Sequence, residues 1–486
     1  MSFTPTGEPR IGWEYSRRSV LQSIASGFGY LAFAGLAQQA TADQAGAERS
    51  AGGEGALAPR PTHFSPRAKR VIFLCMNGGP SHIDLFDPKP ELKQLAAAKS
   101  GPAGPTFMPS PFQFSQHGES GQWISELLPE LSRHADDLCI INSMQTDLPN
   151  HSQAFIQMHT GSFQFTRPSL GAWCLYGLGT ENSNLPGFIT INPPSDNGGA
   201  RNFGSAFLPA IYQGTKIGTN QIPGFYAAIL KVDSEPGPPL KNVESRRLAL
   251  PQQRAQLDLV RDLNRHRLAQ DPHHTAIEAA IESFELAFRM QGEIPELMDL
   301  SDESDTMLRQ YGIGAGSPCD RFGRQCLMAR RLAEAGVRFI EITAPVGWDH
   351  HFRLQEELPA ACAATDRPVA ALLADLKQRG MLDDTLVIWA GEFGRTPYAQ
   401  SGTGRDHNSQ GYSLWMAGGG IQGGLQYGAT DEVGAKAVDR PVHLHDWHAT
   451  ILHLLGLDHK RLTFNHAGRD FRLTDVYGNV VQDLIS

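Results

Sequence analysis

The sequence has few cysteines, and they stand far apart. Six Cys occur among 486 residues, with no C-x-x-C pair and no finger-type spacing, which argues against a structural zinc ribbon and against a disulfide scaffold. Cys319 and Cys326 fall on one predicted helix two turns, or about 10 Å, apart, which is beyond the reach of a disulfide. We therefore expect buried thiols at all six positions.

Long runs of like charge are also missing. Lys and Arg total 42 and Asp and Glu total 51, a formal net charge of −9 that is spread along the chain without acidic or basic blocks. A protein that binds the phosphate backbone of nucleic acid needs a basic face, so nucleic acid is not an expected partner. With 41% hydrophobic and 19% charged residues, the composition is far from that of a disordered chain, and most of the chain is expected to fold.

The chain has no stretch that is long and apolar enough for a comfortable membrane span. The apolar stretch from Val20 to about Ala37 is interrupted by polar residues and glycines, follows two adjacent arginines and ends in small residues. This pattern predicts a twin-arginine export signal over 1–40, with an amphipathic helix as the alternative, and a periplasmic or other extracytoplasmic location. The stretch 41–66, rich in Ala, Gly and Pro, predicts a flexible linker before a folded domain over 67–486.

Short apolar runs alternate with amphipathic stretches over this domain. Apolar runs that end in turn residues are typical of buried parallel strands, and the amphipathic stretches predict helices between them. The alternation predicts an α/β fold, a doubly wound and mainly parallel sheet with helices on both faces. The predicted strands are 70–76, 138–142, 338–343 and 385–390, and the predicted helices are 258–291 with a break at Pro272, 321–335, and 355–379 with breaks at Pro359 and Pro368.

One segment does not fit this alternation. Residues 181–241 are rich in Gly, Pro, Asn and Ser, and the segment is too long for a simple connection between two elements. Loops of this length usually cover a site or bind a ligand, so we expect a functional loop here.

Carboxylates and imidazoles follow several of the predicted strands. In open α/β sheets ligands bind at the carboxyl ends of the strands, and mixed oxygen and imidazole ligands suit a divalent ion, with Zn, Mn and Ca left open. For any single residue a structural role is the alternative: Glu392 would pair with Arg395, and the adjacent histidines after Asp349 would be a solvated pair. The predicted metal ligands are Asn77, Asp84, Asp349, His351, Glu392 and His407.

Six motifs in order carry a resemblance to a known family. They are FLCMNGGPSHIDLFDPKP, GWDHHF, WAGEFGRTP, GRDHNSQGYS, HDWHATILHLLGLD and GRDFRLTDVYG. Together they resemble the bacterial family called domain of unknown function 1501 from about Arg67 to the C-terminus, and that family is similar to the alkaline phosphatase and sulfatase superfamily. The resemblance implies an alkaline phosphatase-like α/β core and hydrolysis of sulfate or phosphate esters at a metal centre.

Within this resemblance several positions match metal ligands. Glu392 stands where sulfatases carry an Asp ligand, and Phe393 stands where they carry a His ligand. Asn77 stands where the first strand of the superfamily ends in an Asp ligand, and a neutral amide oxygen binds a divalent ion more weakly than a carboxylate. The positions similar to Asp and His ligands of alkaline phosphatases are Asp349, His351 and His407.

The nucleophile position departs from the resemblance. Sulfatases carry Cys or Ser at the start of a helix that closes in Leu-Thr-Gly, and the matching stretch here, HSQAFIQMHTG, begins with His151 and Ser152. A helix N-terminus favours an anionic ligand, so these two residues are the predicted catalytic pair. His151 has three open roles: nucleophile, general base or metal ligand.

Two functions from different classes follow from these features. The first is an exported metal-dependent hydrolase that acts on an anionic ester, such as a sulfated or phosphorylated polysaccharide. The alternative is a catalytically altered scaffold that binds an extracellular glycan or a partner protein through the 181–241 loop. Geometry separates them: a hydrolase needs the predicted site residues around one point, whereas a scaffold does not.

Overall fold

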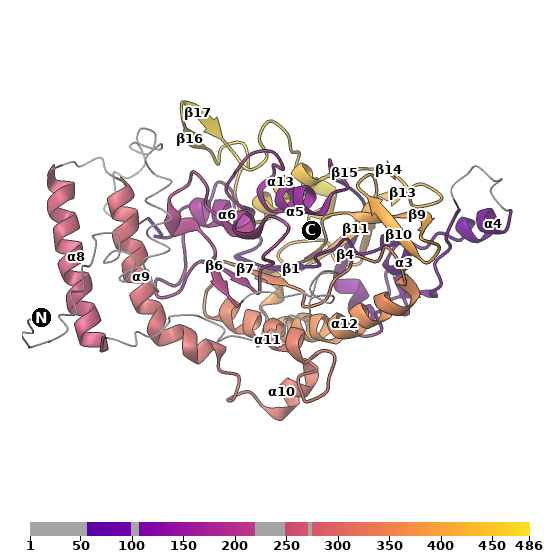
Figure 1. The fold of residues 1–486 in the computed structure, drawn as a ribbon, viewed down its shortest axis with the longest axis horizontal. Coiled ribbons are helices and arrows are strands. Elements are labelled where there is room, and N and C mark those ends of the chain that lie inside the picture. Colours follow the sequence, from indigo (N-terminus) through magenta and orange to yellow (C-terminus); the bar gives the residue numbers. More distant parts are fainter. Residues whose placement is uncertain (1–55, 99–105, 219–247, 271–274) are drawn as a thin grey trace, which may run out of the picture.

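A nine-stranded sheet crosses the protein, with helices on both of its faces (Figure 1). The computed structural model describes residues 56–98, 106–218, 248–270 and 275–486. The strands follow the order β12-β4-β11-β8-β1-β7-β5-β6, and β15 also pairs with β4. Their bounds are β1 (Arg70–Cys75), β4 (Leu138–Gln145), β5 (Phe188–Ile191), β6 (Thr215–Ile217), β7 (Phe339–Thr343), β8 (Thr385–Ala390), β11 (Tyr412–Ala417), β12 (Leu425–Tyr427) and β15 (Val442–His443).

The centre of the sheet is parallel. β1 lies between β7 and β8 and runs parallel to both, and β5 and β6 extend the parallel part beyond β7. β11 is antiparallel to both of its neighbours, β8 and β4. The protein therefore has the mixed α/β fold with a mainly parallel sheet that the sequence predicts.

Alternate residues of β1 enter two different cores. Ile72 and Leu74 join the cluster covered by α11 and α12, whereas Val71 and Phe73 join the cluster covered by α5, α6 and α13 (Figure 1). Side chains of a strand alternate between faces, so a continuously apolar strand needs helices on both sides. All six cysteines are buried free thiols, as predicted. The helices are α5 (His151–Thr160), α6 (Leu170–Leu178), α11 (Asp320–Glu334), α12 (Leu354–Gln378) and α13 (Leu444–Leu454).

The two prolines of α12 do not break it, contrary to the prediction. Pro359 and Pro368 both lie inside one helix of 25 residues, although each removes a backbone donor and crowds the preceding turn. Leu358 and Val369, next to these prolines, are buried in the core beneath the sheet. Packing of the apolar face on both sides of each proline therefore outweighs the local preference to end the helix.

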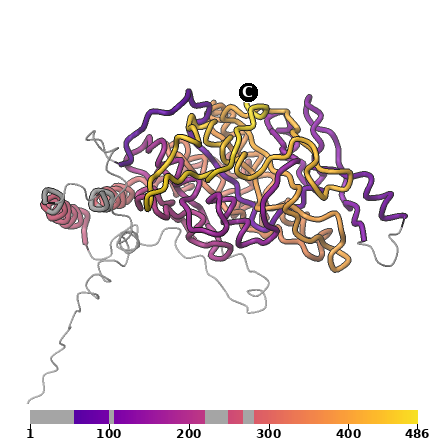
Figure 2. The backbone as a smooth tube through the Cα atoms, turned by 90° about the horizontal axis from the view of Figure 1, so that it is seen from above, coloured from indigo at the N-terminus to yellow at the C-terminus, as the bar shows by residue number. Residues whose placement is uncertain are grey.

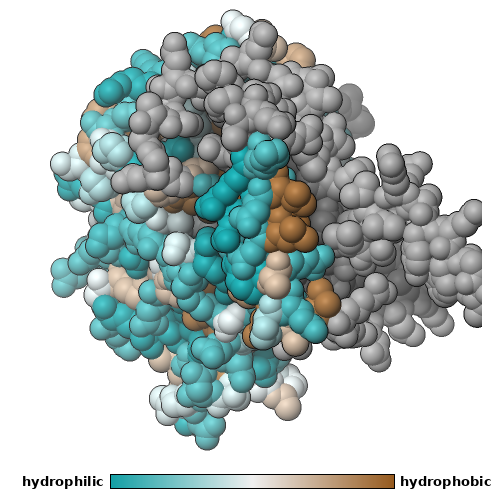
Figure 3. Space-filling view, turned by 90° about the vertical axis from the view of Figure 1, so that its left-hand side faces the viewer, coloured by the Kyte–Doolittle hydropathy of each residue, from teal (hydrophilic) through white to brown (hydrophobic). Residues whose placement is uncertain are grey.

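The predicted helix 258–291, with its predicted break at Pro272, corresponds to two helices. α8 (Leu250–Gln270) and α9 (Thr275–Met298) end and begin on either side of Pro272, which itself lies outside the described residues. The pair stands at one end of the molecule (Figures 1 and 2). Viewed from that end, the described surface is mostly hydrophilic with narrow hydrophobic strips (Figure 3), and the exposed apolar residues of α8 include Leu259 and Leu263.

Two segments predicted to lack regular structure are partly ordered. The 181–241 segment contributes β5 and β6 to the sheet, so it is not a single loop, and its residues 219–241 lie outside the described part. Residues 56–66 of the predicted linker pack on the domain: Arg60 donates to the carbonyl of Tyr176 at 2.5 Å and to the hydroxyl of Tyr212 at 2.8 Å. The folded domain therefore begins before residue 67.

The predicted export signal, 1–40, and the first part of the predicted linker lie outside the described residues. Among the helices that are described, none is long and apolar enough to cross a bilayer. A hairpin of two strands, β9 (Gly394–Gln400) and β10 (Gly404–Asn408), follows β8. It lies over the edge of the sheet at which β1, β7 and β8 end. That edge carries the candidate site.

Candidate metal centre

The segments that follow β1, β7 and β8 meet because these three strands are adjacent and parallel. Gly78 follows β1, and its N–H donates to both carboxylate oxygens of Glu392, which follows β8, at 3.1 Å each. Gly78 has φ +121°, and a Cβ there would lie 2.7 Å from the backbone nitrogens of Trp348 and Asp349, after β7. Only glycine fits this turn.

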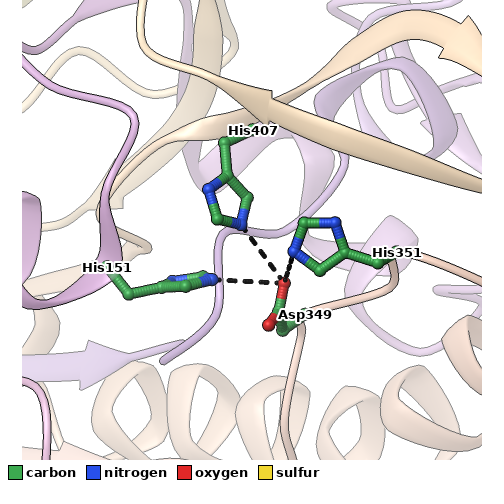
Figure 4. A group of neighbouring side chains, drawn as sticks. All are labelled: His151, Asp349, His351 and His407. Atoms are coloured by element: carbon green, nitrogen blue, oxygen red, sulfur yellow. Dashed lines mark ion pairs between the residues drawn. The ribbon is translucent and has the colours of Figure 1, made fainter. Parts of the chain in front are cut away.

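Three imidazoles converge on one carboxylate oxygen at this edge (Figure 4). The Oδ1 atom of Asp349 lies 2.9 Å from Nε2 of His351, 3.2 Å from Nε2 of His151 and 3.5 Å from Nε2 of His407. One ligand atom from each of the four residues lies within 4.8 Å of the others. His151 begins α5, His407 lies in β10, and the other two follow β7, so three separate parts of the chain build the group.

Each imidazole is held from behind through its Nδ1 atom. Nδ1 of His151 lies 2.6 Å from Oε1 of Glu392, and Nδ1 of His407 lies 2.9 Å from the carbonyl oxygen of Pro149. Nδ1 of His351 contacts Oε1 of Gln400. An acceptor at Nδ1 fixes the tautomer that carries its proton there, which leaves a lone pair on Nε2. Three Nε2 lone pairs therefore point at one place.

The group fits a divalent cation. Nε2 of His151 and Nε2 of His407 are buried without a hydrogen-bond partner of good geometry among the described residues. Three imidazole nitrogens and one carboxylate oxygen form a set of four that zinc-like ions take. The Asp349 side chain is 43% exposed, so the group is open to solvent on one side, where a further ligand can enter.

The charges around Asp349 hold it ionised. Burial raises the pKa of its carboxyl, but the neighbouring His151 and His407 rings and the charge of Arg395 outweigh burial and lower the pKa below its ordinary value. Arg395 lies 2.6 Å from Oδ1 and is almost fully buried. Burial likewise lowers the pKa of His151, but Asp349 and Glu392 reverse this and raise it to about 9 when no cation competes.

The chain matches, over residues 68–485, the family described as "Protein of unknown function (DUF1501)". It belongs to this family. The match confirms the resemblance drawn from the six motifs and spans the whole described α/β domain except its first residues. A search of curated proteins found no match to the DUF1501 chain.

Solved structures similar to the DUF1501 chain include a protein of the alkaline phosphatase superfamily, a sulfatase and a periplasmic domain in complex with Zn. A member of that superfamily from Vibrio parahaemolyticus is 9% identical, with a TM-score of 0.33 over 89% of this chain and 78% of that chain. The PsFucS1 sulfatase from Pseudoalteromonas sp. is 12% identical, with a TM-score of 0.32 over 80% and 68%. The C-terminal periplasmic domain of EcEptC from Escherichia coli, in complex with Zn, is 10% identical, with a TM-score of 0.31 over 86% and 90%.

Four of the predicted site residues of the DUF1501 chain come together in one group, and a fifth, Glu392, lies behind that group. Asp349, His351 and His407 lie in the converging group, as the ligand prediction requires. His151, predicted as a catalytic residue, lies in the same group. Glu392 lies behind His151 with its oxygens occupied by that ring and by a backbone N–H, so its geometry is that of a positioning residue.

Three predicted site residues lie outside the group. Asp84, in α3 (His82–Leu85), is fully buried against Arg405, with Oδ2 2.7 Å from Nε and Oδ1 3.1 Å from Nη2. The ligand prediction for Asp84 is therefore wrong, because the short helix turns its carboxylate toward that guanidinium. Asn77 accepts a hydrogen bond from Asn197 at 3.1 Å, and the exposed hydroxyl of Ser152 donates to Asn197 at 3.2 Å.

Several residues that shape the site of the DUF1501 chain escaped the sequence analysis. Gln400 and Pro149 orient two of the imidazoles, and nothing in their local sequence signals this. The structural alternative paired Glu392 with Arg395, but the guanidinium of Arg395 pairs with Asp349 instead. The same alternative made His350 and His351 a solvated pair, but His350 is buried, and burial lowers its pKa to about 4. These differences depend on how the β9–β10 hairpin folds over the strand ends.

Proposed function

We propose that His151, Asp349, His351 and His407 bind one divalent ion and that the protein is an exported metal-dependent hydrolase of a sulfate or phosphate ester. The observation that carries the proposal is the convergence of three Nε2 atoms, each held through Nδ1, on one carboxylate oxygen. Nitrogen-rich coordination favours Zn or Mn over Ca, because Ca prefers oxygen ligands throughout. Zn is the better fit of the two, since four-coordinate sites of this kind are typical of it.

The ion supplies Lewis acidity: it polarises an ester oxygen and makes a water molecule easier to deprotonate. The residues of the chain hold the ion and orient its ligands. Glu392 keeps the His151 ring in place through Nδ1, and Arg395 fixes Asp349 against the turn after β1. α5 begins at His151, so the partial positive charge of its N-terminus faces the same place. Cation and helix end together favour an anionic ester.

The proposal involves no covalent enzyme intermediate. The sulfatase nucleophile is replaced by His151, whose Nε2 is committed to the ion, and the Ser152 hydroxyl points to Asn197. Water would therefore attack the sulfur or phosphorus directly, and the ester oxygen would leave with a proton. The convergence of the side chains favours this function over the scaffold function, in which the site residues have no reason to meet.

The first test is metal content together with ester turnover. We expect about one ion per chain in the purified protein and loss of that ion in His351→Ala and His407→Ala. His117→Ala, on the hairpin strand β2 (Phe114–His117), is the matched control and should keep the ion. Aryl sulfate and aryl phosphate hydrolysis should follow metal content. A folded wild-type protein that binds no divalent ion would overturn the proposal.

A further inference from the structure

A second polar cavity lies beside the start of α13. Its volume is about 660 Å³. Neither the family resemblance nor the proposed metal centre gives it a role. It is walled by the first turn of α13, the segment after that helix and the segment after β17 (Arg469–Phe471). The side chains that matter for its chemistry are His443, His445, Lys460, Arg472, Tyr477 and Asn479.

Two cations line this cavity without carboxylate partners. In the described part of the chain neither Lys460 nor Arg472 forms an ion pair, and the Nε atom of Arg472 donates to the backbone carbonyl of Asp475. Both charges act on the neighbouring His459: burial lowers the pKa of that ring, and Arg472 and Lys460 lower it further, to about 4. The two cations therefore concentrate positive charge on one wall.

Two histidines complete the wall, and their ring nitrogens already have partners. Nε2 of His443 lies 3.2 Å from a carboxylate oxygen of Asp147, and Nε2 of His445 lies 2.9 Å from the carbonyl oxygen of Gly161. Nδ1 of His443 accepts a hydrogen bond from the backbone N–H of His445 at 3.3 Å. Burial lowers the pKa of His445 below its ordinary value, so the positive charge of the cavity comes from Lys460 and Arg472.

The one acid in the cavity wall is already satisfied. Asp446 accepts hydrogen bonds from the backbone N–H of His443 at 3.1 Å and of Asn479 at 2.7 Å. Its charge is used to cap α13 and to hold the chain at Asn479. Among the described residues it forms no ion pair with Lys460 or Arg472, and two cations against one carboxylate leave the cavity wall with an excess of positive charge.

An exposed aromatic ring faces the same space. Tyr477 is 61% exposed, and its ring stacks on His445 with centroids 5.1 Å apart. His445 stacks in turn on His443 at 4.9 Å. A tyrosine ring with one free face offers a flat, partly apolar surface beside a hydroxyl, which suits a ring with both apolar and polar edges, such as a sugar.

A short segment joins this cavity to the metal centre. Asp147 pairs with His443 at the cavity, and Pro149, two residues later, accepts the hydrogen bond from His407 at the metal centre. Two residues of extended chain span at most about 7 Å. Asn150, the next residue, caps α5, which begins with His151. The cavity wall and the metal centre are thus joined by a few residues at His443, and the length of the ten-residue α5, about 15 Å, separates His151 from the Gly161 carbonyl that His445 contacts.

We propose that the cavity lined by Lys460, Arg472 and Tyr477 binds a second anionic group, a sulfate or phosphate of a saccharide that also reaches the metal centre. Lys460 and Arg472 hold the tetrahedral anion, and Tyr477 contacts the sugar ring that carries it. The substrate class is then a saccharide with repeated anionic groups. The identity of the substrate rests on the proposed function, but binding of the anion does not.

The binding test uses the full-length protein and inorganic anions. We expect titration calorimetry to detect binding of inorganic sulfate or inorganic phosphate in the wild type and in His407→Ala, which disables the metal centre. Arg472→Gln and Lys460→Gln should each weaken this binding about tenfold. Lys436→Gln, an exposed lysine elsewhere, is the matched control and should change nothing. The tighter of the two anions identifies the group. Unchanged affinity in both cavity variants would overturn the proposal.

The turnover test separates this inference from the proposed function. For a saccharide with several sulfate or phosphate groups, Arg472→Gln should raise KM about tenfold and leave kcat unchanged, since the lost contact is far from the reacting bond. For a small aryl ester neither constant should change. An equal rise in KM for both substrates would overturn the second subsite. If the wild type hydrolyses no ester, the proposed function fails, and the anion titration still decides whether the cavity is a binding site.

Discussion

Asp84 and Asp349 both follow central strands, and both were predicted to bind metal, but they meet different partners. Asp84 gives both oxygens to the guanidinium of Arg405, and both side chains are fully buried. Asp349 presents one oxygen to three imidazoles and is 43% exposed. Asp349 also pairs with Arg395, at 2.6 Å, but through that one oxygen only. A buried carboxylate whose two oxygens both bind one guanidinium stabilises the fold, whereas one that also faces three imidazoles and solvent is available to a cation.

The two roles are connected through one hairpin. Arg405, the partner of Asp84, lies in β10 two residues before His407, whose ring belongs to the metal group. The buried ion pair therefore fixes the strand that delivers one imidazole. The comparison predicts that changes at Asp84 act on folding first, whereas changes around Asp349 act on metal affinity.

The largest expected effect is that of Asp84→Asn on stability. The substitution leaves the Arg405 guanidinium buried without its counter-charge, and breaking a buried pair in this way costs about 3–5 kcal/mol. Urea unfolding of the purified variant measures the loss. Asp475→Asn, which breaks an exposed pair with Arg469, is the control and should cost under about 1 kcal/mol. Equal losses in the two variants would contradict the structural role of Asp84.

The sequence predicts the architecture more completely than it predicts the site. Apolar runs and amphipathic stretches predict the parallel sheet because a strand buried on both faces is a continuous apolar run in the sequence. The place of Asp349 and His351 at the sheet edge follows from the rule that parallel strands end at one edge, whereas the β9–β10 hairpin brings His407 there. The helix that begins with His151 also follows, because the motif that closes in Thr160 and Gly161 resembles a known helix.

Partners made by long-range packing leave no such signature. Asp84 and Arg405 are 321 positions apart, and an acid after a buried strand looks the same in sequence whether it binds an ion or a guanidinium. Gln400 and Pro149 accept hydrogen bonds from the imidazoles only because of the way in which the β9–β10 hairpin packs over the strand ends. The two prolines in α12 were misread because tertiary packing decided against local preference.

A third carboxylate extends the comparison to an acid without a cation. Asp366 on α12 is buried and accepts hydrogen bonds from the N–H groups of Glu130 and Leu131, at 2.8 Å each. Burial raises its pKa to about 6, although these hydrogen bonds act in the opposite direction. An acid with a raised folded pKa takes up extra protons on folding between its unfolded pKa, 3.8, and its folded pKa. Its contribution to stability is thus complete below pH 3.8 and is lost as the pH rises through about 6.

The resulting prediction concerns the pH dependence of stability. Between about pH 4.5 and 8 the free energy of unfolding of the wild type should fall by about 2 kcal/mol relative to that of Asp366→Asn, which cannot ionise there. Urea unfolding of both proteins at the two pH values measures the difference. The free energy of unfolding of Asp84→Asn should differ from that of the wild type by a constant amount over this range, because Asp366 is intact and the pKa of Asp84 lies below its ordinary value. Parallel pH profiles of wild type and Asp366→Asn would show that Asp366 is ionised throughout.

The smallest expected effect sharpens the distinction between binding the ion and positioning a ligand. Glu392→Gln keeps an oxygen that can accept the proton of His151 Nδ1 but loses the negative charge, so metal affinity should fall about tenfold. Glu392→Ala removes the acceptor as well, and affinity should fall about 100-fold. Competition with a chromogenic chelator measures both, and Glu356→Gln, an exposed acid at the start of α12, is the control. If Glu392→Gln loses the ion as completely as Asp349→Ala does, then Glu392 is itself a ligand and His151 is free for another role. A graded loss places Glu392 behind the ring, where its two hydrogen bonds already hold it.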